Sequence, residues 1–405
     1  MNSLEYLGSS FNKKTKELDK EKIKKETYDN KSKLNIVLFG ATGVGKSSLV
    51  NAVFGDDIVK SGVGEPITQF LEKIEIKSKG LTLWDTKGIE AKDYENTKEK
   101  LIQDIEKGFN DALESNNDDK APHVVWLCIK ESSSRIEERE HDLLNIAKKF
   151  GIPTVVVFTD TQDENGEQFF KKAKETIDNR HEGFIKNRYV RVNSVPFKFR
   201  GMSVPVSGLE ELLRLTEDCL GDAKKNTAEQ RQNRIEALRK AQEVNIQKKL
   251  NAMIASARKK VHIASAAAAT VGASPIPGSD APLIAAVQSR LIYTLNSEFE
   301  VDEDNNQAVA MITGVLGATA LAQVGKAIVS NALKFIPGVG TLAGGAISAS
   351  TAAVLTQAVG HAYIQVLVAY FDKETGKSIL PDQTSVALKM FKDIFVDMSK
   401  GKIKQ

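Results

Sequence analysis

The sequence predicts a doubly wound α/β domain followed by an all-α domain. Between residues 34 and 222, apolar segments typical of strands alternate with segments of helical periodicity. Beyond residue 222 the strand-like segments stop, and helix-favouring stretches rich in Ala and Gly replace them. The chain of 405 residues is long enough for two such domains. We therefore expect a leader over 1–33, an α/β domain over 34–222 and a helical domain over 223–405.

Composition places the chain among ordinary folded proteins. Hydrophobic residues make up 41% and charged residues 27%. The net charge of +3 gives no nucleic-acid signature. Cys128 and Cys219 lie in apolar segments, which favours buried thiols in a reducing compartment, and the N-terminus lacks the pattern of a secretory signal. We expect a cytoplasmic protein.

The leader over 1–33 mixes nine lysines with six acids. Leu4, Leu7, Phe11 and Leu18 recur at helical spacing, so part of the leader could form an amphipathic helix. The acids among the lysines weaken the case for an anionic membrane surface. We expect a solvated leader rather than a membrane-targeting helix.

Strands are predicted at 34–39, 70–77, 81–85, 123–129, 153–159 and 189–193. The stretches 124–129 and 154–158 are continuously apolar. Such runs are typical of central parallel strands covered on both faces. In sheets of this kind, ligands bind beyond the carboxyl ends of the strands.

A glycine-rich loop stands at such an end, directly between the strand 34–39 and a predicted helix. Its glycines let successive N–H groups point inward at phosphate oxygens, and the helix adds its positive end. Lys46 is placed to reach the terminal phosphates, and the Ser47 hydroxyl to ligate Mg²⁺. The loop and the start of its helix predict nucleotide-binding residues Gly40, Ala41, Thr42, Gly43, Val44, Gly45, Lys46, Ser47 and Ser48.

A second box, Asp85-Thr86-Lys87-Gly88, follows the strand 81–85 about forty residues later. An aspartate at that strand end can hold Mg²⁺ through water, and the Gly88 amide can sense the terminal phosphate of a nucleoside triphosphate. This order of boxes favours a nucleotide switch over a kinase.

The stretches GATGVGKSSLVNAVFG and LWDTKGIE resemble the translation-factor class of P-loop GTPases, especially the Era, septin and immunity-related groups. The resemblance implies GTP or GDP with Mg²⁺ as ligands. It also implies that Thr68 is the switch threonine that closes over the metal. The expected catalytic set is Lys46, Thr68 and Gly88, with Ser47, Thr68 and Asp85 holding the metal.

The base-reading box departs from the pattern of Asn or Thr, Lys, any residue and Asp. The chain offers Thr159-Asp160-Thr161-Gln162-Asp163. In one alignment Asp163 accepts hydrogen bonds from guanine N1–H and the 2-amino group, and we expect it to read the base. Alignment on Thr159 instead puts Gln162 at that position. Ser194, after the last strand, resembles a degenerate final base-contacting box.

Hydrolysis is expected to be slow. Ile89 follows Gly88, where other GTPases carry the glutamine that orients the attacking water. A branched alkyl group cannot orient water, so a partner or a nucleotide-dependent homodimer is expected to supply the missing group. Gly43 stands where potassium-activated members carry Asn, so no potassium stimulation is expected. Arg135, after the fourth strand, is left out of the catalytic set.

The C-terminal half is expected to be helical, with one long helix over 223–260 and Ala/Gly-rich segments at 265–282, 307–325 and 335–371. The last segment contains no acid, Lys or Arg, yet its glycines favour a buried helical hairpin over a membrane-spanning pair. Residues from Thr384 predict an amphipathic helix. Residues 230–370, including Asp280, resemble an uncharacterised helical domain that follows the G domain in some bacterial and fungal GTPases.

The leading expectation is a GTP-dependent switch whose helical domain binds a protein effector or contacts a membrane peripherally. The alternatives are a dynamin-like membrane-remodelling GTPase and a P-loop ATPase with no guanine preference. A guanine nucleotide is the expected ligand in the first two.

Overall fold

The computed structural model describes residues 1–15, 17–29, 31, 33–55, 58, 63–86, 91–115, 117–162, 166–199, 202–223, 226–271, 281–302, 308, 310–315 and 349–399. Contacts divide the chain into a sheet unit, Ser32–Lys249, and a helical unit that combines Met1–Lys31 with Leu250–Gln405. This division differs from the boundaries expected at residues 33 and 222. Residues 223–249 pack with the sheet, and the leader packs with the helices.

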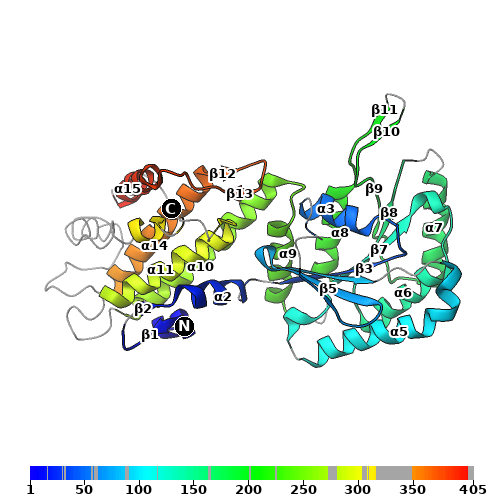
Figure 1. Ribbon diagram of the computed structural model, residues 1–405, viewed down its shortest axis with the longest axis horizontal. Coiled ribbons are helices and arrows are strands. Elements are labelled where there is room, and N and C mark those ends of the chain that lie inside the picture. The colour runs from blue at the N-terminus through cyan, green and yellow to red at the C-terminus, as the bar shows by residue number, and fades with distance from the viewer. Residues whose placement is uncertain are drawn as a thin grey trace. The chain divides into compact units, whose positions relative to one another are not determined.

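The sheet unit is built on a seven-stranded sheet in the order β4-β5-β6-β3-β7-β8-β9. Figure 1 labels β5, β3, β7, β8 and β9 of this sheet. Strands β6, β3, β7, β8 and β9 are parallel, and β4 and β5 add an antiparallel edge. The predicted strands are all confirmed, with ends moved by at most one residue; β4 was not predicted. The bounds are β3 Leu34–Phe39, β4 Val63–Pro66, β5 Leu71–Ile76, β6 Leu81–Thr86, β7 Val124–Lys130, β8 Thr154–Thr159 and β9 Tyr189–Val192.

Helices cover both faces of this sheet. Alternate residues of β3 belong to different cores: Ile36 and Leu38 pack with one set of helices, and Val37 and Phe39 with the other. The first set is α3 (Lys46–Phe54), α8 (Leu209–Gly221) and α9 (Ala228–Ala241), and the second is α5 (Ala91–Glu114), α6 (Glu138–Phe150) and α7 (Gly166–Arg180). The continuous apolar runs predicted this two-sided burial. A short hairpin of β10 (Phe197–Phe199) and β11 (Met202–Val204) follows β9 and was not predicted.

The single helix expected over 223–260 is wrong, because the chain breaks after α9. Gln242 is extended, at φ −74° and ψ 151°. The Gln242 side chain bonds to the backbone on both sides of the break. It donates to the Arg239 carbonyl of α9 and to the Asn245 carbonyl, and it accepts from the Asn245 amide. The Asn245 side chain then accepts from Lys248 N and caps the next helix, α10 (Ile246–Ala269). Local amide hydrogen bonds therefore end one helix and start another.

The helical unit is formed by α1 (Ser3–Leu7), α2 (Lys20–Asp29), α10 from Leu250 onward, α11 (Ala281–Glu298), α14 (Ala349–Ala369) and α15 (Thr384–Ser399). It also holds two short strand pairs: β1 (Phe11–Asn12) with β2 (Glu17–Leu18), and β12 (Phe371–Asp372) with β13 (Lys377–Ser378). The amphipathic helix predicted from Thr384 is confirmed as α15, with Phe391 and Phe395 buried. Residues 335–348 and Asp280 lie outside the described residues.

The prediction of a solvated leader over 1–33 is wrong. Leu7 and Ile23 are fully buried in the core of the helical unit. Arg290 of α11 is 8% exposed and donates from Nη1 to the Leu7 carbonyl at 2.6 Å, Ser10 Oγ at 2.8 Å and Glu26 Oε2 at 2.5 Å. The leader supplies acceptors that a buried guanidinium requires, which its mixture of lysines and acids did not reveal.

Among the described residues, one helix is long and apolar enough to cross a membrane. It is the Ala352–Ala369 part of α14, with a mean hydropathy of 1.4, and 61% of it is buried inside the protein.

Candidate functional site

The loop between β3 and α3 requires glycine. Gly40 has φ +138°, and a Cβ there would lie 2.5 Å from the Cys128 carbonyl oxygen. Gly43 and Gly45 also have positive φ, at 76° and 89°. This backbone brings the loop around to the first turn of α3, where Gly45 is the residue before Lys46. The amide groups of the first helical turn and the helix dipole then favour an anion at the mouth of the loop.

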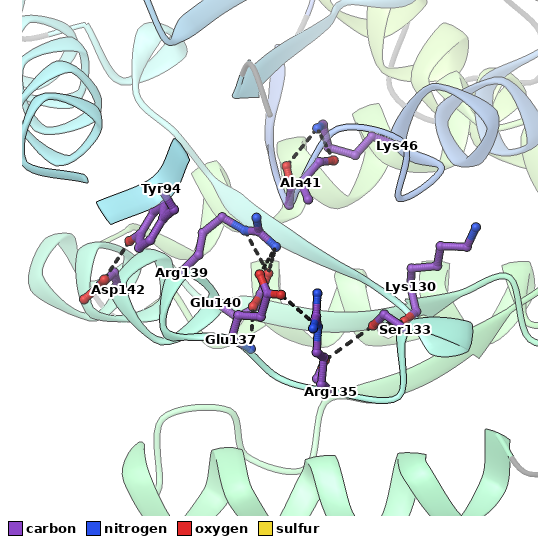
Figure 2. A network of polar contacts seen from close by, with 11 residues as sticks. Ala41, Lys46, Tyr94, Lys130, Ser133, Arg135, Glu137, Arg139, Glu140 and Asp142 are labelled. Carbon is purple, nitrogen blue, oxygen red and sulfur yellow. Dashed lines mark hydrogen bonds and ion pairs between the residues drawn. The ribbon is translucent and has the colours of Figure 1, made fainter. Parts of the chain in front are cut away.

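Lys46 lies within this loop and is 8% exposed. Its ammonium group donates to the Gly40 carbonyl at 2.9 Å and to the Ala41 carbonyl at 3.3 Å (Figure 2). The same nitrogen lies 3.6 Å from Asp85 Oδ1. Weak carbonyl acceptors hold the ammonium, so a phosphate oxygen could replace them at little cost.

Asp85 stands near the end of β6, directly opposite Leu38 in the neighbouring β3. Its Oδ1 is buried and accepts no hydrogen bond from the described residues. Burial raises the pKa of the Asp85 carboxyl, and the charge of Lys46 opposes that shift. A cation beside this oxygen would stabilise its ionised form, and carboxylate oxygen is a preferred ligand of Mg²⁺.

Thr68 occupies the turn between β4 and β5. Its amide donates to the Leu71 carbonyl at 3.1 Å, which fixes the turn. Its hydroxyl oxygen is buried and makes no hydrogen bond within the described part of the chain. Thr68 thus presents a buried hydroxyl oxygen without a hydrogen bond in the described part of the chain, and Asp85 a buried carboxylate oxygen with only the ammonium of Lys46 beside it. Both are hard oxygens, the donor type that suits Mg²⁺. Ser47 is exposed on the first turn of α3, and Lys87, Gly88 and Ile89 lie outside the described residues.

The end of β8 is tied to the glycine loop. Thr159 is 2% exposed, and its hydroxyl donates to the Val44 carbonyl at 2.6 Å. Asp160 follows with φ 57°, and its Oδ2 accepts from Ser132 Oγ at 2.8 Å and lies 3.3 Å from Lys130 Nζ. The bond from Thr159 to Val44 could not be predicted from the sequence, because the two residues are 115 positions apart in the chain.

Gln162 contacts the end of β9. Its Nε2 donates to Asn193 Oδ1 at 3.1 Å, and Asn193 is 1% exposed. Ser194 comes next and is half-buried. Asp163 lies outside the described residues. Of the expected base-contacting segments, the structure therefore brings 162 and 193 together at the edge that carries the glycine loop.

Arg135 makes its ion pair with a neighbour in its own segment. Its guanidinium is 69% exposed and pairs with Glu137 at 2.9 Å, beside the buried Arg139–Glu140 pair (Figure 2). These contacts give Arg135 a surface role within one chain. Among the described residues, no group of His, Cys, Asp and Glu is arranged to hold a metal by itself.

Comparison with known proteins agrees with this geometry. Residues 35–160 match the family described as 50S ribosome-binding GTPase, and residues 235–385 match a domain of unknown function, DUF697. A segment of 71 residues is 40% identical to GTPase Der of Sulfurimonas denitrificans and spans 17% of this chain but only 14% of that relative.

A crystal structure of a probable GTP-binding protein, engB, aligns with 47% of this chain and 100% of its own, at 16% identity and a TM-score of 0.34. The first match lies within the sheet unit, and the second runs from the middle of α9 to the start of α15. Residues 35–160 therefore form a P-loop GTPase domain, and a segment that matches DUF697 follows it.

Proposed function

We propose that this protein is a slow GTPase that works as a nucleotide-dependent switch with a helical effector-binding unit. The convergence of Lys46 and Asp85 at the carboxyl ends of β3 and β6, beside the glycine loop, carries the proposal. The two groups lie where a triphosphate and its counter-ion would need opposite charges.

Each residue has a role in this proposal. Lys46 and the loop amides from Gly40 to Ser48 bind the β- and γ-phosphates. Ser47, Thr68 and Asp85 hold Mg²⁺, which when bound neutralises phosphate charge. The buried oxygens of Thr68 and Asp85, which make no hydrogen bond within the described residues, support this assignment. The Gly88 amide senses the γ-phosphate. Loss of the γ-phosphate on hydrolysis would therefore change the conformation of the segment after β6.

Catalysis by one chain is expected to be weak. Ile89 follows Gly88 and offers no group to orient water. The residues of one chain bind and neutralise the triphosphate, and we propose that a second copy or a partner supplies the water-positioning group or a charge. Arg135 stays outside the catalytic set.

The helical unit is proposed to bind a protein effector. Membrane remodelling is the second candidate, because α14 has the length and composition of a membrane span. Its burial among α11 and α15 favours a core helix. Co-sedimentation with liposomes, with and without a non-hydrolysable GTP analogue, separates the two functions.

Since both cysteines are buried free thiols, we propose a cytoplasmic location.

The decisive test is Lys46→Ala, with Lys171→Ala on the exposed face of α7 as the matched control. We expect Lys46→Ala to lower GTP affinity or turnover by at least about 100-fold, while tryptophan fluorescence stays native. Lys171→Ala should match the wild type. Nucleotide affinity and turnover that survive the loss of Lys46 would refute the phosphate-loop assignment. Competition between GTP and ATP decides against the ATPase alternative if ATP competes poorly.

A further inference from the structure

We infer that Gln162, rather than Asp163, reads the base, and that the site consequently accepts 6-oxopurine nucleotides without selecting for the 2-amino group of guanine. The inference rests on the proposed nucleotide site and deepens it. It names the substrate class as GTP, ITP and XTP together.

Thr159 fixes the register of the base-reading segment. It is the last residue of β8, and its hydroxyl is bonded to the Val44 carbonyl of the phosphate loop at 2.6 Å. The base-reading segment therefore starts in contact with the phosphate loop. Thr159, which makes this contact, takes the first of the four positions of the base-reading box. The fourth position is then Gln162.

Asp160 is excluded as the acid that reads the base. Its carboxylate accepts a hydrogen bond from Ser132 and lies beside Lys130. Lys130 is the last residue of β7, and Ser132 follows that strand. A carboxylate with these partners has little capacity left for donors on a base.

The position of Gln162 suits a base. Thr159 and Val192 are partners in the parallel β8–β9 ladder, so the chain leaves both strands at one edge. The glycine loop follows β3 at the same edge, two strands from β8 and three from β9. At about 4.8 Å per strand this separation is roughly 10–14 Å, comparable to the reach of a nucleotide from phosphate to base.

The orientation of the two amides follows from their neighbours. Asn193 Nδ2 donates to the Pro205 carbonyl at 2.7 Å, which leaves Asn193 Oδ1 facing Gln162. Gln162 must then offer Nε2 to that oxygen. Its Oε1 and its second N–H remain as an acceptor and a donor side by side.

This neutral pair discriminates differently from a carboxylate. A carboxylate only accepts, so it favours the N1–H and 2-amino donors of guanine and repels the 2-oxo group of xanthine. The amide can accept from N1–H of all three 6-oxopurines, and its N–H can donate to the 2-oxo group of xanthine or to O6. No contact then depends on a 2-amino group.

The experiment is displacement of a fluorescent GTP analogue from the full chain by GTP, ITP, XTP and ATP. In the wild type we expect GTP, ITP and XTP to displace with affinities within about tenfold of each other. Gln162→Asp should weaken ITP and XTP relative to GTP by at least about tenfold. Asp163→Asn is the matched control and should leave the GTP-to-XTP ratio unchanged.

Two outcomes overturn the inference: a wild type that prefers GTP over XTP by about 100-fold or more, or an Asp163→Asn variant that reverses the preference toward XTP. The second would restore Asp163 as the base reader. If the proposed GTPase function itself is wrong, the result differs from both of these outcomes: the wild type fails to bind the fluorescent GTP analogue, or no nucleotide displaces it. Tryptophan fluorescence checks that each variant is folded.

Discussion

Replacing Arg290 with methionine is expected to destabilise the helical unit and leave the G domain unchanged. The substitution keeps an apolar side chain in the core but removes the guanidinium. The Leu7 carbonyl and Ser10 hydroxyl lose a donor, and the Glu26 carboxylate loses its cation. The face of the Tyr6 ring, 5.6 Å from the guanidinium carbon, loses a cation as well.

The size of the effect follows from burial. Arg290 and Ser10 are nearly inaccessible, at 8% and 1% exposed. Breaking a buried ion pair by removing one partner costs about 3–5 kcal/mol. Because the methionine retains apolar packing and part of Glu26 reaches solvent, we take the lower end, about 3 kcal/mol. With a urea dependence of about 2 kcal/mol per M, the unfolding midpoint should fall by about 1.5 M.

The two units can be followed separately in one sample. Trp84 and Trp126 are the two tryptophans of the chain and both belong to the G domain. Tryptophan fluorescence therefore reports the G domain, whereas circular dichroism at helical wavelengths reports both units. We expect Arg290→Met to shift a circular dichroism transition while the fluorescence transition stays in place.

Lys22→Met on α2 is the control. Lys22 forms an exposed pair with Asp19 at 3.7 Å, worth at most about 1 kcal/mol. A shift for Arg290→Met no larger than that of the control would refute the buried-pair argument. An equal shift of the fluorescence transition would show that the two units do not unfold separately.

Two further predictions concern the G domain. Specific GTPase activity should rise with enzyme concentration, and Ile89→Gln should raise the activity of the dilute protein; a fast, concentration-independent wild-type rate would show that one chain holds a complete catalytic set. Burial lowers the pKa of His181 from 6.5 to about 4, and neighbouring His141 adds to the shift. The neutral imidazole is thus favoured in the folded state, so G-domain stability should be full above pH 6.5 and fall toward pH 4. Urea midpoints by tryptophan fluorescence at pH 7 and 5 measure this loss, and His181→Phe should reduce it; equal midpoints in the wild type would contradict it.

The sequence predicted the features whose causes are local. The strands that surround the loop are continuous apolar runs. The loop needs glycine at positions such as Gly40 because of its positive φ and close backbone contact, and the glycine pattern of the motif reflects this need. The placement of Lys46 and Asp85 follows from those strands, because the loop and helix that carry Lys46 follow β3 and Asp85 stands near the end of β6, at one edge of the sheet.

Features that depend on distant partners were not predictable in the same way. The bond from Thr159 to Val44 joins residues 115 apart, so the motif alone left two alignments of the base-reading box. The leader looked solvated because it mixes lysines with acids, but the partner of Glu26 is an arginine 264 residues later. The break after α9 depends on side-chain amides of Gln242 and Asn245, which helical periodicity does not capture.

The docking of the leader affects how the protein can be made. Leu7 and its partner Arg290 are separated by 283 residues, and the G domain lies between them in the chain. At about 5–20 residues per second, a ribosome needs roughly 15–60 s to synthesise that interval. The G domain draws its contacts from one continuous stretch, so it can fold while the leader still lacks its partners. The lysines and acids of the leader would keep it soluble in this interval, so its charges have a role during synthesis besides the pairing of Glu26 with Arg290 in the finished core.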